Sequence, residues 1–277
     1  MRPVDLKKLM TISADAPTTV AGEPIVIRGL GKTYVTAAGP NTVLQGIDLE
    51  IAPGELIALV GPSGCGKSTI LKILAGLIPY DTGTVTLGGQ APREGRRDVG
   101  FMLQQAVLMP WRSVAENVRL PFDLAGRKGP DVERRIADLV ELVGLTHAVD
   151  SNPWELSGGM QQRVSLARAL SLDPGVMLLD EPFSALDEFK REHLGLEFTR
   201  MHEELGRTTI LVTHSIPEAV LMSDRIIALG AHPGRVLADV KVDLPRPRSA
   251  AMIGTPHFME LSQQVRSALV GEDGSIA

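Results

Sequence analysis

A glycine-rich stretch from Gly61 to Ser68 carries the strongest chemical signal in the sequence. It fits the pattern G-x-x-x-x-G-K-[ST]. Its glycines let the backbone curl so that successive N–H groups point at phosphate oxygens, and a helix starting here adds its positive end. Lys67 can reach the β- and γ-phosphates of a nucleotide, and the Ser68 hydroxyl can ligate Mg²⁺. The predicted phosphate site consists of Gly61, Pro62, Ser63, Gly64, Cys65, Gly66, Lys67, Ser68 and Thr69.

Two neighbouring carboxylates, Asp180 and Glu181, follow the apolar run from Val176 to Leu179. In enzymes with this kind of phosphate loop, an acid at the end of such a strand holds Mg²⁺, which is the role expected of Asp180. Glu181 could face the attacking water and act as its general base. By themselves, two acids after a strand are usually solvated loop charges. Their occurrence together with the phosphate loop favours the catalytic interpretation.

Gln104 and His214 gain interest from their positions rather than from their residue types. Each comes just after the end of a predicted strand, Asp98–Leu103 in the first case and Thr208–Thr213 in the second. Ligands gather at this edge of open α/β sheets. Either residue alone would more often be structural or exposed than catalytic.

A second anion site is predicted where Leu-Ser-Gly-Gly opens a helix. Ser157, Gly158 and Gly159 offer a hydroxyl and bare backbone N–H groups at the positive end of that helix. In a chain without the other motifs, the same residues would form an ordinary helix cap.

The elements that position these residues alternate between strands and helices, which predicts an α/β core. Short apolar runs bounded by turn residues indicate strands at Ile25–Ile27, Val43–Ile51, Glu55–Val60, Thr84–Leu87, Asp98–Leu103, Val176–Asp180, Thr208–Thr213 and Ile226–Leu229. The helices are expected at Ser68–Leu77, Ser113–Ala125, Asp131–Leu145, Met160–Leu170 and Phe189–Leu205, with a last amphipathic helix that places Phe258, Leu261, Val265 and Leu269 on one face.

Composition and charge fit a globular protein and disfavour some classes of function. The chain has 277 residues, 44% of them hydrophobic and 22% charged, with a formal net charge of −5. This acidic balance argues against a nucleic-acid binder, which needs a basic face. Cys65 is the one cysteine, so no intrachain disulfide can form, and we expect it to be a small filler in the loop. We expect no secretory signal at Met1–Thr19 and see no apolar run long enough to span a bilayer.

With these motifs in order, the chain resembles the nucleotide-binding subunits of ATP-binding-cassette (ABC) transporters over about residues 24 to 235. The matching segments are Gly61–Thr69 (Walker A), Gln104 (Q-loop), Leu156–Gln162 (LSGG signature), Asp180 and Glu181 (Walker B and the catalytic glutamate), Ser184–Asp187 (D-loop) and His214 (switch histidine).

The resemblance implies a P-loop NTPase fold of the ABC cassette type. Such a cassette has a RecA-like core, an antiparallel β-subdomain and an inserted helical subdomain. The chain then divides into an N-terminal arm (1–23), an ABC ATPase domain (24–244, with the helical subdomain at about 105–170) and a linker with a short C-terminal helix (245–277).

The resemblance also implies the cofactors, ATP and Mg²⁺, and roles for single residues. Tyr34 falls where the family stacks an aromatic ring on adenine, and Asp187 lies in the D-loop beside the nucleotide. The implied metal ligands are Ser68, Gln104 and Asp180. The implied catalytic residues are Glu181, His214 and Gln104.

In the implied mechanism two copies pack head to tail, with ATP between the phosphate loop of one and Ser157–Gly159 of the other. Hydrolysis then lets the dimer open. The implied partners are transmembrane permease subunits, which would contact Val107–Trp111 and the helical insert, and, through the complex, an extracytoplasmic substrate-binding protein. No nucleic acid is expected. The expected location is the cytoplasmic face of the cell membrane, the inner membrane in a bacterium.

The finer resemblance is to importer subunits of the nitrate, sulfonate and taurine group. It is carried by Leu108–Arg112, Leu179–Asp187 and His232–Val236. Two departures from the common ABC pattern are Ser215, where many subunits carry aspartate, and Leu103, often phenylalanine. We expect neither to abolish hydrolysis.

Two other classes are alternatives to a transport ATPase of the translocase type. A soluble ABC ATPase of DNA repair or translation would carry long coiled coils or two cassettes, together with the basic surface that nucleic-acid binding needs. This chain has one compact cassette, no heptad run and an acidic balance. A P-loop kinase or GTPase would leave the Leu-Ser-Gly-Gly segment unexplained.

Overall fold

The computed structural model describes residues 22–37 and 39–270. The predicted N-terminal arm, residues 1–23, lies almost wholly outside this part of the chain, as do the residues after 270. Within the described residues, no helix has both the length and the apolar character that crossing a membrane requires.

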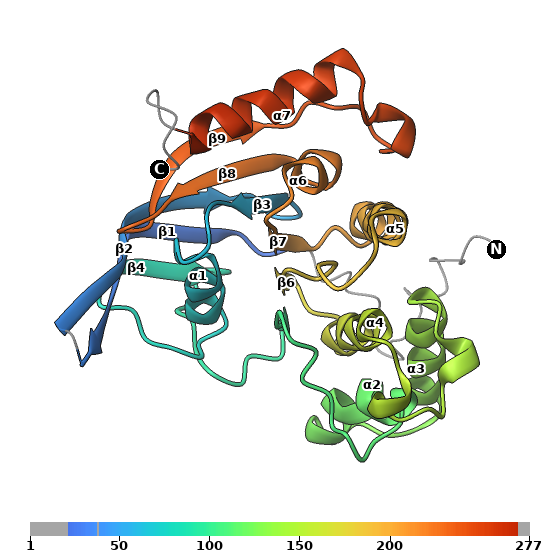
Figure 1. Cartoon of the computed structure of the whole chain (residues 1–277). Coiled ribbons are helices and arrows are strands. Elements are labelled where there is room, and N and C mark those ends of the chain that lie inside the picture. Colours follow the sequence, from blue (N-terminus) through green and yellow to red (C-terminus); the bar gives the residue numbers. More distant parts are fainter. Residues whose placement is uncertain (1–21, 38, 271–277) are drawn as a thin grey trace.

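A six-stranded sheet forms the centre of the molecule (Figure 1). Its strands are β3 (Leu56–Val60), β5 (Val99–Met102), β6 (Val176–Asp180), β7 (Thr208–Val212), β8 (Arg225–Gly230) and β9 (Arg235–Lys241). Their order is β5-β6-β7-β3-β8-β9, and every neighbouring pair is parallel except β8 with β9. The carboxyl ends of the parallel strands therefore meet at one edge, as the sequence-based placement of the site requires.

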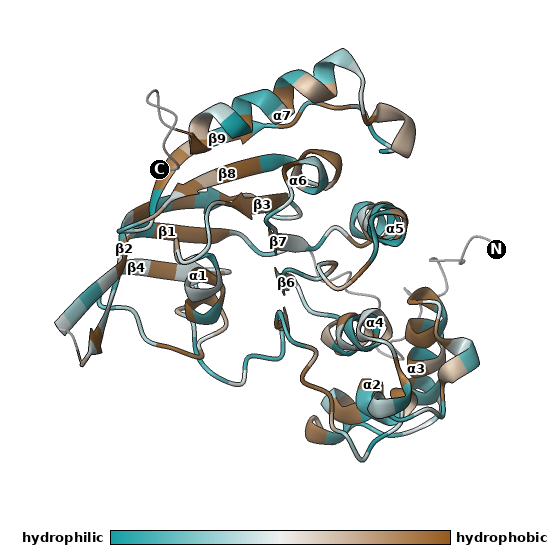
Figure 2. Cartoon of the chain, viewed as in Figure 1, coloured by the Kyte–Doolittle hydropathy of each residue, from teal (hydrophilic) through white to brown (hydrophobic). Residues whose placement is uncertain are grey.

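Packed elements cover both faces of this sheet. In β3, Leu56, Ala58 and Val60 join one hydrophobic core, and Ile57 and Leu59 join the other. Figure 2 shows β3 and β8 as mostly hydrophobic along their length. Burial on both faces explains why the central strands read as short apolar runs in the sequence rather than as alternating patterns.

A second sheet, antiparallel and three-stranded, packs on one of these cores. Its strands are β1 (Ile25–Thr36), β2 (Gly39–Ile51) and β4 (Thr82–Leu87), in the order β2-β1-β4. β1 and β2 extend beyond the predicted Ile25–Ile27 and Val43–Ile51. Their outer parts pair with each other but are largely exposed, so the sequence there lacks a continuous apolar face.

The α-helices of the described residues are α1 (Lys67–Leu74), α2 (Val114–Leu124), α3 (Pro130–Leu142), α4 (Gly158–Ala169), α5 (Glu188–Leu205), α6 (Ile216–Met222) and α7 (Pro256–Leu269). The predicted helices are present within a few residues, and α7 buries the predicted Phe258, Leu261 and Val265. Helix α1 ends at Leu74 rather than at Leu77, because Gly76 takes a φ of 71° that ends the helix. The sequence did not predict α6 or β9.

Helices α2, α3 and α4 pack on one another and reach the sheet through α4, which contacts β5 (Figure 1). The chain enters this group through a loop fixed by Asn117, a fully buried residue of α2. The Asn117 side chain accepts from the N–H of Met109 at 2.8 Å and donates to the carbonyls of Met109, Arg112 and Ser113 at 3.2, 2.9 and 3.0 Å. A buried amide with all these bonds made holds a loop rigidly. The segment that follows Gln104 is thereby fixed in place.

His202 makes the stability of the fold depend on pH. The side chain is 5% exposed, and its ring nitrogens lie 3.1 Å from Thr209 Oγ1 and 3.1 Å from the Gly54 carbonyl oxygen. Burial lowers its pKa from 6.5 to about 4. The neutral ring therefore stabilises the fold above pH 6.5, and this stabilisation is lost as the pH falls toward 4.

We expect the free energy of unfolding of the wild type, relative to that of His202→Gln, to fall by about 2 kcal/mol between pH 7 and pH 5. Urea unfolding at the two pH values measures this. Burial also raises the pKa of Glu218 to about 7, which gives the opposite slope, but that slope is common to both chains and cancels in the difference. If the difference in unfolding free energy between the two chains does not change with pH, His202 is not neutral in the fold.

Candidate nucleotide site

The loop from Gly61 to Gly66 connects β3 to α1 and depends on its glycines. Gly64 and Gly66 have φ values of 83° and 97°, which favour glycine. At Gly61 a Cβ would lie 2.4 Å from the carbonyl oxygen of Leu229 on the neighbouring strand β8, so a side chain there would displace main chain. No side chain caps the start of α1. Its first N–H groups are thus left for an anion.

Lys67 is buried with its ammonium inside this loop. Its Nζ donates to the carbonyls of Gly61 and Pro62 at 2.8 and 2.9 Å and lies 3.7 Å from the Sγ of Cys65. Within the described residues it forms no ion pair with a carboxylate. A buried cation whose hydrogen-bond partners are all neutral favours the arrival of a negative ligand such as a phosphate.

Asp180 and Ser68 meet beside the loop as a pair of oxygen ligands. Asp180 is 3% exposed, and its Oδ1 is buried with no hydrogen-bond partner. Burial raises the pKa of its carboxyl, while a hydrogen bond from the Ser68 side chain opposes this. An unsatisfied buried carboxylate oxygen next to a hydroxyl fits Mg²⁺, which takes one or two protein ligands and completes its shell with phosphate and water. The described residues contain no cluster of three or more His, Cys, Asp or Glu side chains arranged to hold a metal by themselves.

Glu181 brings the other two predicted catalytic residues together. Gln104 Nε2 donates to Glu181 Oε2 at 3.0 Å, and His214 Nδ1 lies 3.5 Å from the same oxygen. Glu181 itself has a φ of 49°, which is strained for a residue other than glycine. Its N–H donates to the carbonyl of Val212 on β7 at 3.0 Å, which helps to hold this conformation. Side chains after β5, β6 and β7 thus converge on one carboxylate.

Gln162 links the helix after the Leu-Ser-Gly-Gly segment to this cluster, and the sequence did not single it out. Its Nε2 donates to the main-chain carbonyl of Gln104. Its Oε1 is buried without a hydrogen-bond partner. The signal available in the sequence was a polar residue on the inner face of α4, one turn after Ser157.

Ser157 caps the N-terminus of α4 and is exposed. Its hydroxyl accepts from the N–H of Met160 at 3.3 Å. A Cβ at Gly158 would meet nothing within 4 Å, whereas one at Gly159 would lie 2.4 Å from the side chain of Leu186. In the described part of the chain, no hydrogen bond or ion pair joins Ser157–Gly159 to the phosphate loop. The two predicted anion sites are therefore separate within one chain.

The predicted D-loop, Ser184–Asp187, contacts both Glu181 and the start of α4, where the Leu186 side chain lies close to Gly159. The Ser184 hydroxyl donates to the main-chain carbonyl of Glu181 at 3.0 Å. Asp187 caps α5 by accepting from the N–H of Lys190 at 3.0 Å, and the Lys190 ammonium lies 2.8 Å from the same carboxylate. These contacts with Lys190 lower the pKa of Asp187, so it stays ionised.

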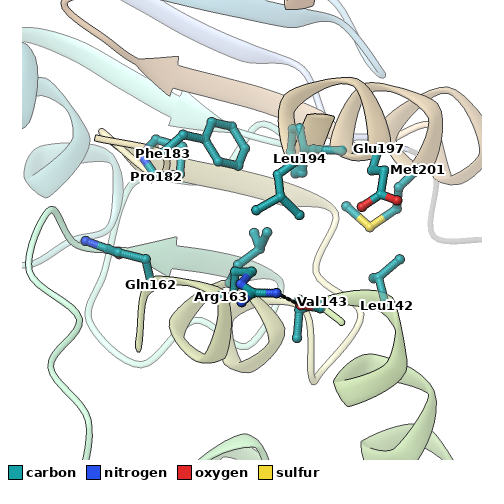
Figure 3. A pocket seen from close by; sticks show the side chains of 11 residues that line it. Leu142, Val143, Gln162, Arg163, Pro182, Phe183, Leu194, Glu197 and Met201 are labelled. Atoms are coloured by element: carbon teal, nitrogen blue, oxygen red, sulfur yellow. Dashed lines mark hydrogen bonds between the residues drawn. The ribbon is translucent and has the colours of Figure 1, made fainter. Parts of the chain in front are cut away.

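A small cavity lies between α5, the end of α3 and the middle of α4 (Figure 3). Its volume is about 20 Å³, which is too small for any ligand larger than a water molecule. Arg163 lies on its wall and donates to the carbonyl of Val143 at 2.9 Å, while Gln162 points away toward Gln104. The cavity is a packing gap where the helical insert meets α5, and we assign it no ligand.

Tyr34 lies on β1 with its ring half-exposed at 37%. The Nζ of Lys32 lies 5.4 Å from the ring centroid and is held there by Asp81 at 3.0 Å. On the paired strand β2, the side chain of Leu44 touches Gly66 of the phosphate loop. The ring thus belongs to the sheet that adjoins the loop.

Replacing Tyr34 with alanine should weaken ATP binding by between about twofold and tenfold, because stacking on a base contributes about 0.5–1.5 kcal/mol. Titration with a non-hydrolysable ATP analogue measures the effect, and Tyr34→Phe should bind as the wild type does. Unchanged affinity in Tyr34→Ala would remove the ring from the adenine site.

Several known proteins are similar in sequence to this chain. The family described as ABC transporter matches residues 44–184. An aliphatic sulfonates import ATP-binding protein of Bacillus subtilis is 42% identical over 236 residues, which cover 85% of this chain and 90% of that protein. The chain belongs to the family of ABC transporter ATP-binding proteins. This ABC cassette is therefore an ATPase with ATP and Mg²⁺ as its cofactors.

Two longer relatives contain an equivalent of the cassette as one part. A bicarbonate transport ATP-binding protein of Synechocystis sp. is 41% identical over 246 residues, which cover 87% of this chain and 37% of that protein. A nitrate import ATP-binding protein of Synechococcus elongatus is 41% identical over 231 residues, which cover 82% of this chain and 35% of that protein. The cassette thus spans little more than a third of each. The predicted resemblance to nitrate and sulfonate importer subunits is confirmed.

A solved structure of a dimeric ATP-binding cassette, in a post-hydrolysis state with ADP and Pi, matches the fold with a TM-score of 0.73 and 31% identity. The match covers 80% of this chain and 100% of that one. The predicted ABC cassette fold is confirmed.

Proposed function

We propose that this cassette drives an importer for a small anion, of the kind whose relatives are named for nitrate, bicarbonate and aliphatic sulfonates. It would work as a peripheral subunit at the cytoplasmic face of a cell membrane, with separate permease subunits that span the membrane. An extracytoplasmic substrate-binding protein would deliver the anion to those subunits.

The convergence of Gln104, Glu181 and His214 beside Ser68 and the buried Asp180 is the observation that carries the ATPase part of the proposal. Lys67 and the loop N–H groups would hold the β- and γ-phosphates. Ser68, Asp180 and the amide oxygen of Gln104 would hold Mg²⁺, which neutralises charge on the phosphates. Glu181 would then take a proton from the attacking water, and His214 would donate to the γ-phosphate.

The open N-terminus of α4 supports a head-to-tail dimer as the active form. Ser157 and Gly158 are exposed and lie apart from the phosphate loop of their own chain. They can approach a γ-phosphate held by a second copy, whose own Ser157 would close over the first nucleotide. This exchange makes a twofold arrangement in which each site needs both copies.

A groove beside the edge strand β5 supports the docking of a permease. It has a volume of about 500 Å³, and its walls include Phe101, Leu120 and Leu124. Trp111, in the loop that leads into α2, is 71% exposed. Large apolar side chains that stay exposed, as Trp111 and Leu124 do, are typical of a surface that contacts a partner.

Uptake by cells tests the importer. In cells that carry Glu181→Gln in place of the wild-type chain, uptake of one labelled anion among nitrate, bicarbonate and an alkanesulfonate should fall to the background of a deletion strain. Wild-type uptake of all three anions would contradict the proposed function.

A further inference from the structure

Arg248 is a buried cation that no element of the proposed mechanism uses. It is 2% exposed, and its two terminal nitrogens donate to four main-chain carbonyls. These belong to Val220 at 2.9 Å, Leu221 at 3.2 Å, Ser223 at 3.2 Å and Val242 at 3.5 Å. Burial lowers the pKa of the guanidinium to about 10, so it remains charged at neutral pH. A buried charge whose hydrogen bonds within the described residues all go to main-chain carbonyls is costly unless those bonds are well formed.

Three of the four carbonyls lie at or just after the end of α6. The last carbonyls of a helix have no partner within the helix and carry its partial negative charge. Helix α6 has only 7 residues, which is too short to be stable by itself. Arg248 therefore binds the end of this helix and adds to its packing on α5, α7 and β3.

The N-terminal end of α6, at Ile216, lies two residues after His214. Ser215 caps the helix by accepting from the N–H of Glu218 at 3.3 Å, and its own N–H donates to the Thr213 hydroxyl at 3.0 Å. His214 Nδ1 lies 3.5 Å from Glu181 Oε2. A displacement of α6 would therefore move His214 relative to that carboxylate.

The segment that carries Arg248 is itself anchored. Helix α7 packs on α6, β8 and β9, and it buries Phe258, Leu261 and Val265. Arg246, two residues before Arg248, pairs with Asp224 at 2.5 Å. The C-terminal segment thus forms a fixed support on the outer side of α6.

We propose that Arg248 is a positioning residue for ATP hydrolysis: the C-terminal segment holds α6 through this guanidinium and thereby sets the place of His214. The inference rests on the proposed role of His214 at the γ-phosphate. It assigns Arg248, which lies after residue 244, a part in catalysis that acts through α6.

Single-turnover hydrolysis by the full-length chain tests this, because it resolves slow rates. Arg248→Met should lower the rate by between about threefold and thirtyfold. Its affinity for a non-hydrolysable ATP analogue should stay within about twofold of the wild type, and Arg248→Lys should recover part of the rate. Arg225→Met is the matched control, since within the described residues Arg225 bonds to Glu50, Glu55 and Asp239 and to neither α6 nor the segment after residue 244. It should lower the melting temperature and leave the rate unchanged.

A double-mutant cycle separates positioning from a general structural role. In a His214→Ala background, Arg248→Met should change the rate by less than about twofold, because the residue through which it acts is gone. The inference would be overturned if Arg248→Met lowered the rate as much in the His214→Ala background as in the wild type. An unchanged rate in Arg248→Met alone would also overturn it. Should Arg248→Met fail to fold, Arg248→Lys is read in the same cycle and should show the same non-additivity. A wild-type rate in His214→Ala alone would instead refute the proposed role of His214.

Discussion

Replacing Glu181 with glutamine should lower the rate of ATP hydrolysis by at least about a hundredfold while ATP-dependent dimerisation persists. A general base typically contributes 10²- to 10⁴-fold, and the amide cannot take a proton from water. Glutamine keeps the size of the side chain and can still contact Gln104 and His214, which converge on the Glu181 carboxylate at 3.0 and 3.5 Å. Phosphate release measures the rate, and size-exclusion chromatography with ATP measures the dimer.

The matched control is Glu94→Gln, which removes an exposed carboxylate in the loop between β4 and β5 and should leave both properties unchanged. A rate within about threefold of the wild type in Glu181→Gln would exclude Glu181 as the base. Loss of the dimer together with hydrolysis would mean that the carboxylate acts in binding instead.

Placing arginine at position 157 should abolish both ATP-dependent dimerisation and hydrolysis. In the proposed dimer, Ser157 and Gly158 approach the γ-phosphate that a second copy holds, and a long side chain at this exposed position would keep the two copies apart. Because each site needs both chains, we expect hydrolysis to fall by at least about a hundredfold. ATP binding to the separate chain should persist, since the phosphate loop is untouched.

Ser267→Arg is the control for Ser157→Arg, because Ser267 is an exposed serine of α7 and the same charge is introduced there. It should form the dimer as the wild type does. If Ser157→Arg also dimerises and hydrolyses ATP normally, the Leu-Ser-Gly-Gly segment has been assigned wrongly.

Local patterns in the sequence predicted the parts of the fold that local patterns determine. The strand Val176–Asp180 is an apolar run because both faces of β6 are buried, and its predicted bounds are those of the structure. The sequence predicts a helix at Ser113–Ala125, and α2 runs from Val114 to Leu124 with its start capped by Ser113 and Glu116. The site residues Gln104, Glu181 and His214 could be placed at one edge because parallel strands end there.

Contacts between distant segments left no such pattern. The hydrogen bond from Gln162 to the Gln104 carbonyl joins residues that are 58 positions apart, and no local pattern around either residue predicts it. Helix α6 is held at one end by Arg248, the last residue of the linker-like stretch Pro245–Arg248, where it reads as a surface charge. Short elements of this kind depend on tertiary contacts rather than on their own periodicity.

A crystal structure of Glu181→Gln with Mg²⁺ and ATP tests the central claim most directly. We expect two copies packed head to tail. Residues 61–68 of one chain and Ser157–Gly159 of the other should hold the phosphates of each ATP. Crystals grown with saturating nucleotide in which the 61–68 loop holds no phosphate would contradict it.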